Sequence, residues 1–531
     1  MNDFLTRRSG WIILASAIVA AIPLYWPELP PLTDLMGHIG RYSVQLNLHH
    51  DPLLQRYYSF QWAMIPNLGV DLLIGPVAAV AGLEMGVKLI VISIVMATVA
   101  GFLFLGRVAH GRIPVAAFFS LPLAYGFPFH FGFVNYCLSM ALAFLLFACW
   151  MRLGQKERIG FRAVLFMPLS VIIWLAHVSG WGALGLFAFA SEYVRLREGG
   201  RKRFASSLEG LLHCLPLALP AILMVVVRSQ DVQGKTGHFF EWQTKFQWFS
   251  MALSDRWQGF DLGSVGLIAI LIAFAAIIRE LRFDRTLGLA AFLLFGAFIV
   301  IPRVLIGSAY ADMRLAPYII AMAVLAIGAK PATPTGLLNV IMGLGLLFFG
   351  ARTVATTASF FEYDRVITAE LGAVDQIPVG ARVMALTGRT CRAEWMQERR
   401  THLPSVALAR RRIFINDQFV MAGAQLLGVH YPAAGNFQQD PSQMAVADDC
   451  ARPDWRRLTD AVAIFPREAF DYVWVINPPQ SETVDYSGLS PVWRWERSAL
   501  YRINKTAQPL ATHQTAAAPA RPDGVPVRTG R

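Results

Sequence analysis

The sequence predicts an all-α polytopic membrane domain followed by a small C-terminal α/β or α+β domain, and three observations support this prediction. The chain of 531 residues is 55% hydrophobic and only 15% charged, more apolar than a water-soluble fold of this size. About eleven apolar stretches, each flanked by Arg or Lys, fill the first two-thirds of the chain. After residue 352 the composition shifts toward Pro, Asp, Gln and Arg, and short strand-like runs appear.

The apolar stretches are predicted to be helices, because lipid offers no partner to the backbone polar groups and the alternation of a barrel strand is missing. The stretch 11–25 follows Arg7 and Arg8 and has no small-residue cleavage site, so we expect an uncleaved first span. By the positive-inside rule the basic clusters lie in the cytoplasm together with the N-terminus. These clusters are 107–112, 152–162, 195–203 and 279–285.

Between these clusters the apolar stretches pair into hairpins that turn on the outer side. The pairs are 113–129 with 133–151, 163–176 with 183–194, 211–227 with 265–278, and 286–301 with 316–328. A last span, 337–351, leads to the exterior. The chain must cross the membrane an odd number of times between the first external loop and the cytoplasmic cluster at 107–112. Two apolar segments, 68–83 and 88–105, lie between them, so one of the two should not cross. The first of them is predicted to be re-entrant or interfacial, because it carries Asp71 and Pro76.

We therefore expect a transmembrane domain over 1–351 with a long external loop at 26–67, and an external, periplasmic domain over 352–505. Residues 506–531 are rich in Ala, Pro, Thr and Arg and are predicted to be disordered. Within the tail, strands are predicted at 382–386, 462–465, 472–476 and 499–503, and helices at 353–376 and 455–461.

The net charge of +12 is spread over inner loops and the tail rather than gathered into one stripe, so no nucleic-acid partner is expected. Cys391 and Cys450 both fall in the external tail, where an oxidising compartment would allow a disulfide; whether they pair is left open. The sequence has no phosphate-binding glycine loop, no nucleophile elbow and no zinc-ligand spacing. These absences argue against ATP-driven transport.

Three polar residues in the first external loop are the main candidates for chemistry. Asp34, His38 and Arg41 are spaced by four and three residues, so on a helix they share one face. Asp34 is the candidate general base or ligand of a divalent ion, with His38 orienting it or sharing its role. The alternative is a surface helix with a simple Asp–His pair. The spacing does not fix a ligand count, so a divalent-metal cofactor stays open.

Other outer turns add candidate binding residues. His130 and Asn135 belong to the aromatic run 126–136, which predicts a stacking surface for a sugar, a wall for a lipid chain, or an interfacial aromatic belt. His177 follows at the next outer turn and is expected to face the same cavity.

Arg303 and Arg314 lie in the outer turn 302–317. The guanidinium of Arg314 is suited to an anionic group such as a diphosphate, since it can bind phosphate oxygens with two hydrogen bonds. The alternative is a structural ion pair of Asp312 with either arginine.

This order of segments resembles the GT-C superfamily of integral-membrane glycosyltransferases, which take sugars from polyprenyl-phosphate donors. Asp34 matches the family's acid in the first external loop, 66–83 is similar to its Pro-led juxtamembrane stretch, and 107–112 resembles its basic turn. One departure is that Asn135 occupies the place where the family commonly has a second acid. Asp71, Asp51 or Asp231 serves instead, or catalysis uses one acid, or this member has lost activity.

The resemblance implies a hexosyl- or pentosyltransferase of the bacterial inner membrane that moves a sugar from a polyprenyl-phosphate donor to an envelope glycan or lipid on the external face. It further implies that Asp34 deprotonates the acceptor hydroxyl and Arg314 stabilises the departing phosphate. Two alternatives are a carrier or flippase for a lipid-linked saccharide and a non-catalytic membrane assembly protein. Convergence of Asp34, His38, His177 and Arg314 in one cavity would favour the enzyme.

Overall fold

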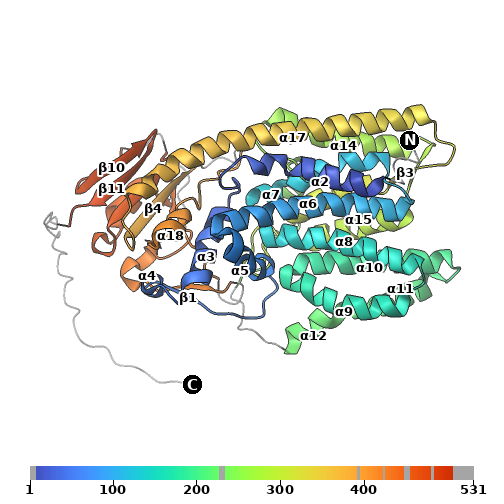
Figure 1. Ribbon diagram of the computed structural model, residues 1–531, viewed down its shortest axis with the longest axis horizontal. Coiled ribbons are helices and arrows are strands. Elements are labelled where there is room, and N and C mark those ends of the chain that lie inside the picture. Colours follow the sequence, from blue (N-terminus) through green and yellow to red (C-terminus); the bar gives the residue numbers. More distant parts are fainter. Residues whose placement is uncertain are drawn as a thin grey trace, which may run out of the picture.

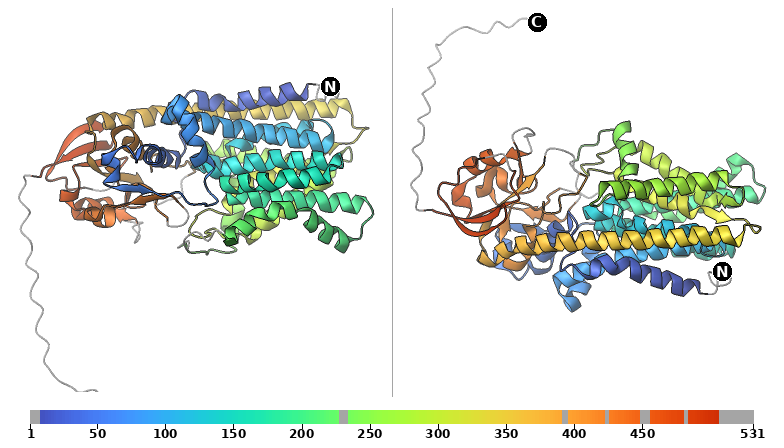
Figure 2. Two further views of the ribbon diagram at one scale, coloured as in Figure 1. Left: turned by 60° about the horizontal axis from the view of Figure 1, so that its bottom comes forward. Right: turned by 90° about the horizontal axis from the view of Figure 1, so that it is seen from above.

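The structure is a computed structural model that describes residues 8–226, 234–390, 395–421, 425–447, 455–479 and 483–505. Cys391, Cys450 and Asp231 lie outside these ranges, so their predicted roles stay predictions. The molecule is elongated, with a bundle of helices at one end and a sheet-containing domain at the other (Figure 1). The two further views show the same division (Figure 2).

Five helices within the described residues are long and apolar enough to cross a membrane. They are α6 (Leu83–His110), α8 (Val134–Gln155), α9 (Ile159–Ala176), α14 (Gln258–Ile277) and α17 (Thr335–Leu371) with the short helix η5 (Gly372–Gln376) that continues it. A sixth span is formed if α11 (Arg203–His213), η3 (Leu215–Ala218) and α12 (Leu219–Val226), bent by 51°, count as one. This confirms a polytopic α-helical membrane protein; the predicted number of about eleven spans stays a prediction.

The bundle is completed by helices that are shorter or less apolar. These are α2 (Ser9–Tyr25), α5 (Gly69–Ala81), α10 (Val178–Glu198), α13 (Trp242–Ser250), α15 (Arg285–Val300), η4 (Met313–Leu315) and α16 (Ala316–Leu325). At 13 residues α5 is about 20 Å long, too short to cross a bilayer core of about 30 Å. This length agrees with the prediction that 68–83 does not span; its place relative to the membrane stays a prediction.

The span predicted at 113–129 is not one continuous helix, and whether it crosses the membrane stays a prediction. The chain there forms three short helices in succession, η1 (Val115–Phe119), η2 (Leu121–Tyr125) and α7 (Phe127–Phe131). Pro122 and Pro128 each stand in the first turn of a new short helix, where the missing N–H is tolerated, but neither can continue the helix before it. The break brings Gly132 close to Asp34, at the start of α3.

Helix α17 has 37 residues and runs along the bundle into the C-terminal domain (Figure 1). The predicted domain boundary at 351/352 therefore falls inside a continuous helix, and the division itself stays a prediction. The C-terminal sheet has the strand order β10-β11-β9-β4-β7-β8, with β5 also paired to β4. Its strands are β4 (Arg382–Arg389), β5 (Phe414–Ile415), β7 (Met444–Val446), β8 (Arg456–Arg457), β9 (Tyr472–Ile476), β10 (Leu489–Trp495) and β11 (Ser498–Ile503).

Strands β4, β9 and β11 confirm three of the four strands predicted in the tail, and β4 is parallel to β5, β7 and β9. The strand predicted at 462–465 is wrong, because this segment belongs to helix α19 (Leu458–Ile464). Leu458, Ala461, Val462 and Phe465 are buried at helical spacing, which a short apolar run does not reveal by itself. The helix predicted at 455–461 begins late, since 456–457 form β8. The domain also contains η6 (Pro432–Phe437), η8 (Arg467–Ala469) and α18 (Ser405–Arg411).

The first external loop is held between the helical bundle and the C-terminal domain. It contains α3 (Leu35–Asn47), α4 (Pro52–Gln55) and β1 (Tyr58–Phe60), and β1 pairs antiparallel with β6 (Leu427–Val429) of the C-terminal domain. Helix α3 lies against α18, and a Cβ on Gly40 would come within 3.0 Å of a Ser405 backbone oxygen. Glycine is required here for the close approach of the two helices.

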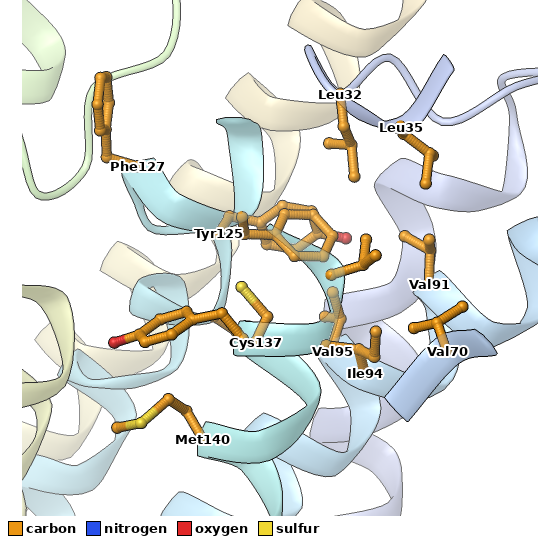
Figure 3. Packing of buried hydrophobic residues seen from close by; sticks show 14 of the residues in the cluster. Leu32, Leu35, Val70, Val91, Ile94, Val95, Tyr125, Phe127, Cys137 and Met140 are labelled. Carbon is orange, nitrogen blue, oxygen red and sulfur yellow. The ribbon is translucent and has the colours of Figure 1, made fainter. Parts of the chain in front are cut away.

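The other side of the loop packs on the bundle (Figure 3). Leu32 and Leu35 lie above a cluster that includes Val91 and Ile94 of α6 and Tyr125 of η2, all of them buried. Burial of these side chains fixes the start of α3, at Asp34, against the outer end of the bundle.

Candidate functional site

Asp34 is anchored through its backbone to the broken segment that ends at α7. Its N–H donates to the carbonyl of Phe131 (2.9 Å), and the N–H of Thr33 donates to the carbonyl of His130 (3.2 Å). Gly132 follows with φ of 92°, and a Cβ there would lie 2.8 Å from the Asp34 nitrogen. The local sequence of prolines and glycines therefore positions Asp34 from both sides.

This geometry predicts that Gly132→Ala destabilises the protein and displaces Asp34. A left-handed backbone costs a residue other than glycine about 1–3 kcal/mol, and the clash with the Asp34 nitrogen adds to this cost. We expect a lower unfolding temperature in detergent. Gly182→Ala is the matched control, because Gly182 lies in α10 with nothing within 4 Å of an added Cβ. Equal stability of the two variants would contradict the predicted contact.

The carboxylate of Asp34 is not used for structure. Asp34 stands at the N-cap position of α3, yet its side chain makes no capping hydrogen bond. Within the part of the chain that the structure describes, this carboxylate has no hydrogen-bond or ion-pair partner. Burial and, to a smaller extent, the carboxylate of Asp440 raise the pKa of Asp34 to about 8, against the opposing charges of Arg314 and Arg389. An acid in such surroundings is suited to proton transfer near neutral pH.

Arg314 supplies a positive charge close to Asp34. Its guanidinium donates to the Ser308 hydroxyl (3.0 Å) and the Ala309 carbonyl (2.9 Å), and it lies 3.8 Å from the ring centroid of Phe133. It forms no ion pair with a carboxylate of any described residue. Because its charge is uncompensated by a local acid, the guanidinium can accept an anionic ligand.

The alternative prediction, an ion pair of Asp312 with Arg314 or Arg303, is wrong. Asp312 pairs with Lys245 at 2.9 Å, and both side chains are buried. Asp312 also accepts from the Met313 N–H (2.8 Å) as the cap of η4. The ammonium of Lys245, on α13, neutralises Asp312, so the guanidinium of Arg314 remains available to bind a ligand.

His177 lies on the same side of the bundle as Arg314. Its Nδ1 accepts from the Ser179 N–H (3.1 Å), so the ring caps α10, and its edge faces Tyr136 with 5.5 Å between the ring centroids. The Tyr136 hydroxyl in turn donates to the Arg314 carbonyl (2.7 Å). The charge of Arg314 thus acts on both Asp34 and His177, and His177 has a partly structural role; a shared cavity for the three residues stays a prediction.

His38 turns toward the C-terminal domain instead. Its ring stacks at 6.0 Å on Tyr42 and lies 6.0 Å from the ring of Phe419, which itself contacts His402 at 4.2 Å. Burial, with the charge of Arg41 and the nearby His402, lowers the pKa of His38, so this imidazole is neutral. The structure shows only a backbone hydrogen bond between His38 and Asp34 (3.1 Å), and the shared catalytic role stays a prediction.

Arg41 is held in a buried network rather than in an open site. It forms an ion pair with Asp71 (3.0 Å), and both side chains are buried. The amide of Asn135 donates to the carboxylate of Asp71 (3.3 Å) and to the backbone carbonyl of Asn67 (2.8 Å), and its oxygen accepts from the Val70 N–H (2.6 Å). This network joins α3, α5 and α8, and it gives Arg41 and Asn135 a positioning task.

The network predicts that Asn135→Asp, which would restore the family's acid, destabilises the protein. A carboxylate there would face the Asp71 carboxylate and two Asn67 oxygens without a proton to donate, at a cost of about 2–4 kcal/mol. We expect a lower unfolding temperature. The double variant Asn135→Asp/Asp71→Asn keeps one acid and one amide and should recover part of the loss; no recovery would contradict the pairing.

The side chains of His130 and Arg303 have partners other than Asp34. His130 is fully buried, and its Nδ1 contacts the guanidinium of Arg399 (3.2 Å), which pairs with Asp255. Arg303 pairs with Glu241 (3.4 Å), and 37% of its side chain is exposed. Neither position favours the substrate contact predicted for it.

Of the three acids suggested as substitutes for Asn135, two have structural partners. Asp51 caps α4 by accepting from the Leu53 N–H (2.9 Å) and lies 3.5 Å from Arg412, and Asp71 is committed to Arg41. Asp231 lies outside the described residues. Among the residues described, no group of three or more His, Cys, Asp or Glu is placed to hold a metal ion.

Sequence reasoning missed the contribution of the C-terminal domain. Arg389 ends the parallel strand β4, and Asp440 follows η6; the charges of both act on Asp34. They also act on His402, whose pKa is lowered mainly by burial. Burial and the Asp440 carboxylate raise the pKa of Asp417 to about 7. The available signal was the position of Arg389 after a predicted strand, since ligands bind at the carboxyl ends of parallel strands.

Fold and site together define a multi-pass membrane protein in which charged residues of the first loop, the bundle and the C-terminal segment act on one another around Asp34. The solved structure of ArnT from Cupriavidus metallidurans bound to undecaprenyl phosphate is similar, with 12% sequence identity and a TM-score of 0.52. The match covers 94% of this chain and 99% of that chain. The apo state of the same protein matches with 14% identity, 93% and 98% coverage and a TM-score of 0.48, too low to add support.

No family model matches the sequence, and no curated protein matches it either. The structural similarity therefore concerns the fold. This chain shares its fold with ArnT over nearly its whole length, which agrees with the fold that the resemblance to the GT-C superfamily predicted.

Proposed function

We propose that this protein is a membrane glycosyltransferase that transfers a sugar from a polyprenyl-phosphate donor to an envelope glycan or lipid. The observation that carries the proposal is the half-buried carboxylate of Asp34, which has no partner among the described residues and feels the charges of Arg314 and Arg389, neither of which pairs with a described carboxylate. One acid for proton transfer and two guanidinium groups for a phosphate are what such a reaction needs. The ArnT structure that shares the fold holds undecaprenyl phosphate, which supports the same class of lipid here.

In the proposed reaction Arg314 and Arg389 bind the phosphate of the donor. Asp34 accepts the proton of the acceptor hydroxyl as its oxygen attacks the anomeric carbon. The bond between that carbon and the phosphate oxygen breaks, and polyprenyl phosphate leaves with its new negative charge held by the two arginines. Stabilisation of the leaving group in a site shielded from water is the larger contribution.

Asp440 is proposed as the second carboxylate of the site, because Asn135 is an amide and cannot serve as an acid. Its oxygen accepts from the Gln443 amide (2.7 Å), and its N–H donates to the Gln418 carbonyl (3.0 Å). The amide of Gln418 reaches the Gly37 carbonyl of α3 (3.4 Å), so this segment is tied to the helix that Asp34 begins. We propose that the C-terminal domain lies outside the inner membrane and covers the site, with the N-terminus in the cytoplasm.

The test is release of polyprenyl phosphate by the full-length protein in lipid nanodiscs. A panel of polyprenyl-phosphate hexoses and pentoses is supplied with an envelope lipid extract as acceptor, and released lipid phosphate is quantified. Release from one donor establishes the transferase and names the sugar. If no donor is consumed, the protein is reconstituted into sealed vesicles, where movement of labelled lipid-linked saccharide from one leaflet to the other would identify a carrier. The absence of both release and movement would favour the non-catalytic assembly protein.

A further inference from the structure

A second site lies at the end of the bundle opposite the C-terminal sheet. There the antiparallel strand pair of β2 (Leu281–Phe283) and β3 (Ile327–Ala329) lies beside the end of α6 and the start of α17. The space they enclose is a cavity of about 570 Å³. This volume falls in the range of small-molecule sites, and the cavity shares no lining residue with the Asp34 region.

The polar wall of this cavity is basic. Arg112, Arg282 and Lys330 line it, and no Asp or Glu is found among its described lining residues. The side chains of Arg112 and Arg282 make no hydrogen bond or ion pair with any residue that the structure describes, whereas Lys330 donates to the Arg279 carbonyl. Two guanidinium groups without a partner at one cavity favour a phosphate, which each can bind with two hydrogen bonds.

His110 has a different task at the same cavity. Its Nε2 donates to the Leu325 carbonyl (2.9 Å), and a Cβ on Gly328 would lie 2.6 Å from its Nδ1. The imidazole thus fixes the antiparallel β2–β3 strand pair to the end of α6. The cavity is therefore preformed by the fold.

The opposite wall is apolar and continues to the lipid-facing surface. Leu338 and Ile341 of α17 line the cavity. Val340, Leu344 and Leu347 share the next face of this helix and are 58%, 51% and 69% exposed. In a membrane these side chains contact acyl chains. A ligand with a phosphate and an acyl tail would satisfy both walls at once.

We propose that this cavity binds the headgroup phosphate of an anionic membrane phospholipid, with the acyl chains along α17. Basic pockets between transmembrane helices on the cytoplasmic side are known to attract anionic lipid headgroups. The continuous apolar face of α17 argues for a lipid over a free phosphate. This proposal is independent of glycosyl transfer and is tested by binding.

The experiment measures displacement of labelled dioleoyl phosphatidylglycerol from the purified full-length protein in a zwitterionic detergent. The test variant is Arg112→Gln/Arg282→Gln. The matched control is Lys156→Gln/Arg158→Gln, which removes two exposed cations at the α8–α9 turn. This turn lies at the same end, because Gln155 donates to the Val108 carbonyl (3.2 Å). Competitors are phosphatidylcholine and the soluble glycerol 3-phosphate.

We expect the test variant to bind phosphatidylglycerol at least about tenfold more weakly, the control to bind like the wild type, and Arg112→Lys/Arg282→Lys to retain only part of the affinity, because an ammonium keeps the charge but not the paired hydrogen bonds. Phosphatidylcholine and glycerol 3-phosphate should compete poorly. Unchanged affinity in the test variant would overturn the proposal, as would equal competition by glycerol 3-phosphate, which would indicate a soluble phosphate. The unfolding temperature without added lipid controls for folding, and the single variant Arg282→Gln serves if the double variant is unstable.

Discussion

Asp34→Asn is expected to reduce release of polyprenyl phosphate by about 10³-fold, because an amide cannot accept the proton of the attacking hydroxyl. The measurement is the initial rate of release from the donor that the wild type uses, at saturating donor. Binding of the donor should change little, since the guanidinium groups that we assign to its phosphate remain. Full activity of this variant would remove Asp34 from the mechanism.

The pH dependence adds an independent signature of the same residue. With a folded pKa of about 8, the reactive carboxylate form of Asp34 becomes more abundant as pH rises toward 8, so the wild-type rate should increase with pH up to this value and then level off. A profile that is flat between about pH 6 and 9 would contradict the assignment.

The same pKa predicts an effect on stability that separates lost chemistry from unfolding. The carboxyl of Asp34 binds its proton more tightly in the folded than in the unfolded chain, so its contribution to stability is present at acidic pH. That contribution declines as pH rises from about 4 through about 8. Asn does not titrate. The unfolding temperature of Asp34→Asn should therefore exceed that of the wild type at pH 8, and the difference should shrink toward pH 5.

Arg314→Ala is expected to lower the catalytic rate by about 10²- to 10³-fold, because it removes a charge that stabilises the leaving phosphate. Arg314→Lys should recover only part of the rate, since an ammonium cannot form two parallel hydrogen bonds. Polyprenyl phosphate should also bind Arg314→Ala more weakly. The measurements are initial rates over a range of donor concentrations and product inhibition by polyprenyl phosphate.

Arg303→Gln is the matched control in the same outer turn. Arg303 is partly exposed and pairs with Glu241, a surface ion pair that contributes about 1 kcal/mol or less. Its loss should leave the rate within about twofold of the wild type. If Arg303→Gln and Arg314→Ala reduce the rate equally, the phosphate is held by the turn as a whole and the specific role of Arg314 is wrong.

The bundle and its first loop could be predicted from the sequence because both depend on local patterns. Apolar stretches between basic clusters gave α6, α8 and α9 close to their observed bounds, since helices in lipid need only their own hydrogen bonds. The proline-flanked acid at the start of α3 singled out Asp34. The break at 113–131 was not predicted, because Pro122 and Pro128 lie inside an apolar run of the right length for a span.

The sequence alone therefore determined the class of fold, the apolar segments and the candidates Asp34 and Arg314, all of which follow from composition and spacing along the chain. Only the tertiary structure decided which charges stay free. Arg41 is neutralised by Asp71, and His130 accepts a hydrogen bond from Arg399, 269 residues away in the chain. The charges of Arg389 and Asp440 reach Asp34 because the C-terminal domain packs on α3. Such contacts join residues remote in sequence, where no helical or strand period relates the partners.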